Sequence, residues 1–149
     1  MTSYVVDSSV ILERIIRSSP HKAKVERLFS EAARGRVKLF VTLLTLSEVL
    51  YAASRLYELA GVERPNEEAA TLVEWVRSRC RVVALSESSA LRAGELKKLL
   101  KLALVDCYVI AVAEELGCAA LFLKREREML GKENMLKQLP IEFLAERDI

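Results

Sequence analysis

Short runs of apolar and β-branched residues alternate along the chain with longer segments whose apolar residues recur at helical spacing. The short runs predict five strands, at Ser3–Val6, Val37–Val41, Arg81–Leu85, Ala119–Leu123 and Ile141–Leu144. The longer segments predict helices at Ser9–Arg17, Lys22–Arg34, Leu44–Leu59, Glu67–Arg79, Ser88–Leu100 and Val105–Leu116, with a short helical piece at Arg127–Leu130. Glycines 35, 61 and 117 mark three of the helix ends.

Strands that alternate with helices of this length require crossover connections, which are right-handed and join parallel strands. The pattern therefore predicts an α/β protein, a three-layer α/β/α sandwich with a mainly parallel central sheet of four to five strands. A chain of 149 residues has the size of one domain. We expect a single domain over residues 1–149.

Composition narrows the class of protein. Hydrophobic residues make up 52% of the chain and charged residues 30%, which excludes a disordered or fibrous protein. The net charge of +2 gives no argument for a nucleic acid or a membrane surface, so any basic surface must be local. No apolar run approaches the roughly 18 residues of a membrane span, and we expect no membrane association.

The few cysteines and histidines limit the chemistry. Three cysteines without a C-x-x-C pair argue against a disulfide framework and a zinc site, and they fit a reducing cytoplasm. His21 is the only histidine, so the sequence offers almost no residues for Ser-His-Asp or Cys-His catalysis. If the protein is an enzyme, we expect carboxylates to do the chemistry.

Two of the three aspartates lie in the most apolar stretches of the chain. Asp7 ends the first predicted strand, and Asp106 lies near the start of a helix that is apolar on every side. An ionised carboxylate there is costly to desolvate unless it caps a helix, pairs with a cation or binds a metal. Capping of a helix, for which Asp is favoured, is open for both residues.

Two glutamates follow the second and fourth predicted strands. Glu48 lies one to two turns into the helix after the second strand, and Glu126 lies just after the fourth. Each glutamate also has an interpretation that involves no ligand. Glu48 fits the polar side of an amphipathic helix, and the alternating charges around Glu126 fit a solvated turn.

The carboxyl ends of parallel strands share one edge of the sheet, where ligands bind. We therefore expect Asp7, Glu48, Asp106 and Glu126 to gather in one pocket. Like charges so close need a counter-charge, and no Lys or Arg lies in the apolar segments next to Asp7 or Asp106. All-oxygen ligation favours Mg²⁺ or Mn²⁺, and such a pocket suits hydrolysis of phosphodiester bonds in nucleic acid.

Four segments form a pattern in order and spacing: Tyr4–Ile11, Ser47–Val49, Leu104–Ala113 with Gly117 after it, and the strand Ala119–Leu123. This pattern resembles that of the PIN-domain family, particularly the VapC-like toxins of toxin–antitoxin pairs. The resemblance covers nearly the whole chain.

The resemblance implies a Mg²⁺- or Mn²⁺-dependent ribonuclease. Asp7, Glu48 and Asp106 match the metal-binding acids of the family, and Ser8 matches its auxiliary polar position. The resemblance also implies a homodimer, which a small antitoxin protein inhibits through a tail that occupies the acidic groove.

The chain departs from the family pattern after the fourth strand. The family has a Thr-x-Asp-x-Asp-like stretch there, where this chain has Lys124-Arg125-Glu126-Arg127-Glu128. Glu126 aligns with the expected acid but is one methylene longer, and Glu128 is expected at the surface. Lys124 replaces a hydroxyl residue and is suited to contacting a phosphate.

Basic residues flank Asp106 and Glu126 in the sequence and are candidates for contacting RNA phosphates. They are Lys97, Lys98, Lys101, Lys124, Arg125 and Arg127, with Lys124, Arg125 and Lys101 as the main candidates. The alternative is an ordinary charged helix face.

The leading hypothesis is a metal-dependent endoribonuclease, the toxin of a VapBC-type pair. The first alternative is a non-catalytic PIN-like module that binds RNA or protein, which the departure at Glu126 leaves open. The second is a phosphoacceptor signalling domain. That domain needs an adjacent acidic pair after the first strand, whereas serines follow Asp7 here.

Overall fold

The computed structural model describes residues 1–147, so Asp148 and Ile149, the last residues of the predicted domain, lie outside the described residues. Five parallel strands form one sheet in the order β3-β2-β1-β4-β5. They are β1 (Thr2–Val6), β2 (Val37–Thr42), β3 (Arg81–Val83), β4 (Ala119–Phe122) and β5 (Ile141–Phe143). All five correspond to predicted strands.

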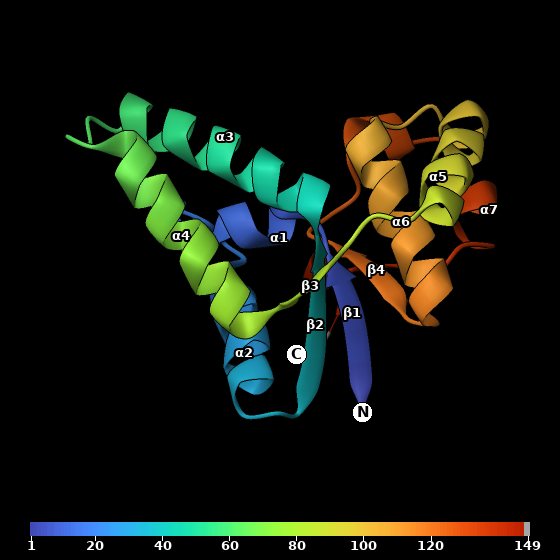
Figure 1. Ribbon diagram of the computed structural model, residues 1–149, viewed down its shortest axis with the longest axis horizontal. Coiled ribbons are helices and arrows are strands. Elements are labelled where there is room, and N and C mark those ends of the chain that lie inside the picture. The colour runs from blue at the N-terminus through green and yellow to red at the C-terminus, as the bar shows by residue number, and fades with distance from the viewer. Residues whose placement is uncertain (148–149) are drawn as a thin grey trace.

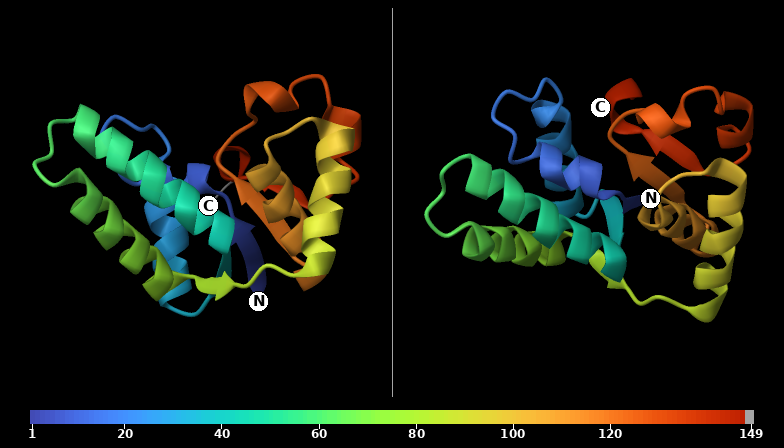
Figure 2. Two further views of the ribbon diagram at one scale, coloured as in Figure 1. Left: turned by 45° about the horizontal axis from the view of Figure 1, so that its top comes forward. Right: turned by 90° about the horizontal axis from the view of Figure 1, so that it is seen from above.

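Helices cover both faces of this sheet (Figures 1 and 2). The helices are α1 (Ser8–Glu13), α2 (Lys22–Ala33), α3 (Leu43–Leu59), α4 (Pro65–Arg79), α5 (Glu87–Leu100), α6 (Leu104–Leu116) and α7 (Glu133–Leu136), with 3₁₀ turns η1 (Arg127–Met129) and η2 (Leu144–Glu146). Helices α1–α4 pack on one face, and α5 and α6 pack on the other. In the described part of the chain, no helix is long and apolar enough to cross a membrane.

Alternation along β1 divides the core into two layers. Tyr4 and Val6 join the apolar cluster under α1–α4, whereas Val5 between them joins the cluster under α5 and α6. Successive strand residues point to opposite faces, and a parallel sheet covered on both faces is apolar on both. The predicted three-layer α/β/α sandwich is confirmed.

Some predicted boundaries are wrong. The first helix ends at Glu13 rather than Arg17, because the backbone then tightens into i→i+3 hydrogen bonds such as that from Ile16 N to Glu13 O, 3.2 Å. Strand β3 ends at Val83 because its partner in β2 is the last strand residue before α3 begins. Helix α7 was not predicted, since its four residues are too few to show a period.

Two junctions position the candidate site. The α3 helix begins directly after β2, where the Thr42 side chain accepts a hydrogen bond from Thr45 N at 3.1 Å. The α6 helix ends at Gly117 (φ 68°), and β4 starts at Ala119. Because its 13 residues span about 20 Å, α6 begins at the carboxyl edge of the sheet. The starts of α3 and α6 therefore lie at the edge where β1 and β4 end.

Candidate metal centre

Asp7 joins β1 to α1, and its two carboxylate oxygens have different surroundings. It is the N-cap of α1, and its Oδ2 accepts a hydrogen bond from Ser9 N at 3.0 Å. The residue is only 2% exposed, and Oδ1 is a buried atom without a hydrogen-bond partner in the described part of the chain. Capping therefore accounts for Oδ2, and Oδ1 is the oxygen available to a cation or another polar partner.

Asp106 does not cap its helix. The N-cap of α6 is Ala103, and Asp106 is the third helical residue, 8% exposed and in the first turn. Its carboxylate gains from the positive end of the helix dipole, which offsets only part of the cost of burial. The capping alternative for Asp106 is wrong.

Glu126 completes a group of three acids. One carboxylate oxygen from each of Asp7, Asp106 and Glu126 lies within 4.8 Å of the other two. Asp7 and Glu126 meet because β1 and β4 are neighbours, paired up to Val6 and Leu121. Three carboxylate oxygens this close together could hold one metal ion.

The charges of these acids oppose one another in the absence of a cation. Burial, and then the charge of Asp7, raises the pKa of Asp106 from 3.8 to about 8. The same two causes raise the pKa of Glu126 from 4.5 to about 7. Burial also raises the pKa of Asp7, although hydrogen bonds from Ser9 oppose it. The group is suited to binding a divalent cation, which would relieve this repulsion.

Glu48 lies beside this group without belonging to it. Its charge contributes to the raised pKa of Asp7, Asp106 and Glu126. Ser8 is 7% exposed, and its hydroxyl donates a short hydrogen bond to Glu48 Oε1. Ser8 thus orients Glu48 at the edge of the cluster.

Sequence reasoning missed the influence of Glu128. The side chain is exposed, as expected, but its charge contributes to the raised pKa of both Asp106 and Glu126. Its spacing of two residues after Glu126 was the available signal. The chain between Glu126 and Glu128 passes from an extended segment into a turn, so their spacing does not show whether the two side chains point the same way. Only the fold brings the charge of Glu128 near the cluster.

The basic candidates differ in their surroundings. Lys124 is exposed two residues after the end of β4, and Lys101 is exposed at the end of α5 in the left-handed region (φ 57°). Arg125 instead pairs with Glu146 at 3.1 Å and lies over the Phe143 ring. Lys97 donates to the Leu102 carbonyl at 3.0 Å, which supports the turn before α6.

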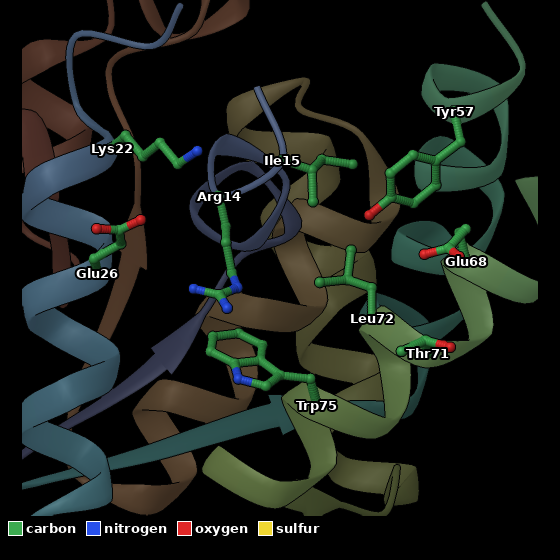
Figure 3. A pocket seen from close by; sticks show the side chains of 9 residues that line it. All are labelled: Arg14, Ile15, Lys22, Glu26, Tyr57, Glu68, Thr71, Leu72 and Trp75. Carbon is green, nitrogen blue, oxygen red and sulfur yellow. The ribbon is translucent and has the colours of Figure 1, made fainter. Parts of the chain in front are cut away.

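A pocket of about 370 Å³ lies elsewhere, between the chain after α1 and helices α2, α3 and α4 (Figure 3). Arg14 stacks over the Trp75 ring there, 3.9 Å from its centroid. Two basic residues, Arg14 and Lys22, share the lining with two acids, Glu26 and Glu68. Because these charges balance, the pocket lacks the excess of one charge that the acid cluster has.

Solved structures with similar folds come from several prokaryotes. The chain matches VapBC2 from Rickettsia felis bound to a promoter DNA fragment with TM-score 0.68 and 14% identity, over 95% of this chain and 98% of that one. It matches VapC20 of Mycobacterium tuberculosis, a Sarcin-Ricin loop cleaving toxin, with TM-score 0.62 and 16% identity, over 84% and 90%. PAE2754 from Pyrobaculum aerophilum gives TM-score 0.61 and 21% identity, over 98% and 91%.

At these identities the structural matches establish the fold alone. No curated protein sequence matches the chain significantly. The family model of the PIN domain matches residues 4–127, a segment that begins in β1 and ends just beyond Glu126. That segment is most of the chain and contains all four predicted acids, and the protein therefore belongs to the PIN domain family.

Proposed function

We propose that the protein is a Mg²⁺- or Mn²⁺-dependent endoribonuclease that hydrolyses phosphodiester bonds of RNA. The observation that carries this proposal is the convergence of Asp7, Asp106 and Glu126 within 4.8 Å, with Asp7 Oδ1 buried and unpartnered in the described part of the chain. Membership of the PIN domain family supports a nuclease.

The donor set fits a hard cation. Asp7, Asp106 and Glu126 would hold the ion through oxygen atoms, with Glu48 beside them. A divalent ion there would supply activation of water and neutralise charge on the phosphodiester. The chain's own part is to hold the carboxylates in place on rigid elements and to exchange the protons of Asp106 and Glu126 for the ion.

RNA binding would use local positive charge at the same edge of the sheet. Lys124 and Lys101 are exposed next to the elements that present Glu126 and Asp106. Lysine side chains contact phosphates without reading sequence. Arg125 remains a candidate, although its pairing with Glu146 must open before it contacts RNA.

The toxin role, the partners and the compartment belong to this proposal. Similarity to the VapBC2 and VapC20 structures supports a toxin of a VapBC-type pair, with a small antitoxin protein as partner. Exposed apolar side chains along α3, such as Leu43, Leu50 and Tyr51, support a homodimer. A cytoplasmic location and a single domain over residues 1–149 remain predictions.

The test is a cleavage assay on mixed RNA with and without Mn²⁺. We expect the unaltered chain to cleave RNA only with the ion, and Asp106→Asn to lose cleavage while keeping its circular dichroism spectrum. Glu74→Gln on α4, where the carboxylate pairs with Arg77 at the surface, is the matched control and should cleave normally.

The alternative function is a non-catalytic module. RNA binding without cleavage, together with no Mn²⁺ binding in calorimetry, would favour that module over the enzyme. Cleavage by Asp106→Asn at the unaltered rate would refute the assignment of Asp106.

A further inference from the structure

The end of β4 carries a buried backbone N–H that the sheet does not satisfy. Pairing of β4 with β1 runs up to Leu121, whose carbonyl accepts a hydrogen bond from Asp7 N at 2.9 Å. Leu123 lies two residues later and is only 4% exposed. A buried N–H group without a partner is costly, so Leu123 N needs an acceptor.

Ser9 supplies that acceptor. Its Oγ accepts the hydrogen bond from Leu123 N at 3.1 Å. If β1 continued, a backbone carbonyl would accept this bond in the parallel ladder, but the chain turns into α1 at Ser8. The hydroxyl of Ser9 thus extends the link between the two chain segments by one step beyond the sheet.

The same residue also orients Asp7. Ser9 N donates to Asp7 Oδ2 at 3.0 Å, and Ser9 opposes the rise in the pKa of Asp7 that burial causes. A serine hydroxyl has one donor and two acceptor sites, so the Ser9 hydroxyl keeps its own proton free while it accepts from Leu123 N. With Oδ2 engaged, Oδ1 is the oxygen left without a partner in the described residues.

We propose that Ser9 is the positioning residue that sets the separation of Asp7 from the segment carrying Glu126. Leu123 precedes Glu126 by three residues, so the hydrogen bond to Ser9 holds that segment where it leaves the sheet. The inference rests on the proposed function, because it concerns the affinity of the three acids for a divalent ion. Neighbours that orient metal ligands typically contribute about 10- to 100-fold in affinity.

The test compares three variants with the unaltered chain. Ser9→Ala removes the hydroxyl but keeps the backbone N–H on Asp7, and Ser9→Thr restores a hydroxyl. Ser19→Ala is the matched control, since Ser19 Oγ also accepts a backbone N–H, from His21 at 3.1 Å, outside the acid cluster. Calorimetry gives the Mn²⁺ affinity, thermal melting in EDTA gives the stability, and NMR gives hydrogen exchange of the Leu123 amide.

We expect Ser9→Ala to bind Mn²⁺ about tenfold more weakly and to exchange the Leu123 amide faster. Ser9→Thr and Ser19→Ala should keep the affinity of the unaltered chain. Equal Mn²⁺ affinity in Ser9→Ala and the unaltered chain would overturn the role of Ser9 alone, as would a matching loss in Ser19→Ala or a failure of Ser9→Thr to restore binding. If the unaltered chain binds no Mn²⁺, the proposed function fails as well.

Discussion

Replacing Asp106 by Asn should stabilise the metal-free protein at neutral and alkaline pH, although it should abolish metal binding. Burial and neighbouring acids raise the pKa of Asp106 from 3.8 to about 8. The folded protein therefore holds this proton more tightly than the unfolded chain does. The free energy of unfolding falls as pH rises from about 4 to about 8, and Asn, which does not titrate, removes this loss.

The size of the effect follows from that shift. One pKa unit corresponds to about 1.4 kcal/mol, so the rise from 3.8 to about 8 sets an upper limit of about 6 kcal/mol. Burying the Asn amide costs about 1–3 kcal/mol, and losing a negative charge in the first turn of α6 costs about 0.3–1 kcal/mol. We expect a net gain of about 2–4 kcal/mol near pH 8, or a rise of about 5–10 °C in melting temperature.

Thermal melts in EDTA across this pH range, followed by circular dichroism, measure the gain. The difference between Asp106→Asn and the unaltered chain should be larger near pH 8 than near pH 5, whereas Glu74→Gln should track the unaltered chain. Added Mn²⁺ should raise the melting temperature of the unaltered chain and of Glu74→Gln, but not that of Asp106→Asn. A variant that is less stable than the unaltered chain near pH 8, or a difference independent of pH, would refute the reasoning.

Two further substitutions test the surroundings of the cluster. Ser8→Ala removes the donor to Glu48 and should lower stability by about 1 kcal/mol in urea unfolding and slow RNA cleavage several-fold; unchanged values for both would contradict the orienting role of Ser8. Lys124→Ala should weaken RNA binding for all sequences and reduce the slope of log affinity against log salt by about one, as measured by salt-dependent titration. An unchanged slope would show that Lys124 does not contact phosphate.

Much of the fold could be predicted from the sequence because strand and helix periods are local. All five strands appeared as short apolar runs, and Gly117 marked the end of α6, where φ is 68°. The predicted ends of elements are wrong where a neighbouring element decides them. Strand β3 stops at Val83 because β2 has no further strand residue to pair with it, and no local pattern reports that.

The sequence by itself determined which acids are candidates. A carboxylate in an apolar stretch stands out because its desolvation must be compensated, and this alone singled out Asp7 and Asp106. Whether each capped a helix stayed open, since Asp is favoured at helix starts whatever else it does.

Only the tertiary structure decided which of these acids lie together in one site. The strand order places β1 beside β4, which brings Asp7 to Glu126 across more than a hundred residues, and Asp106 lies inside the first turn of α6 rather than at its N-cap position. The tertiary structure also brings the Ser9 hydroxyl to Leu123 N at the end of β4, and it pairs Arg125 with Glu146. The contacts of Asp7, Ser9 and Arg125 join residues far apart in the chain, and they depend on how the layers pack rather than on the period of any segment.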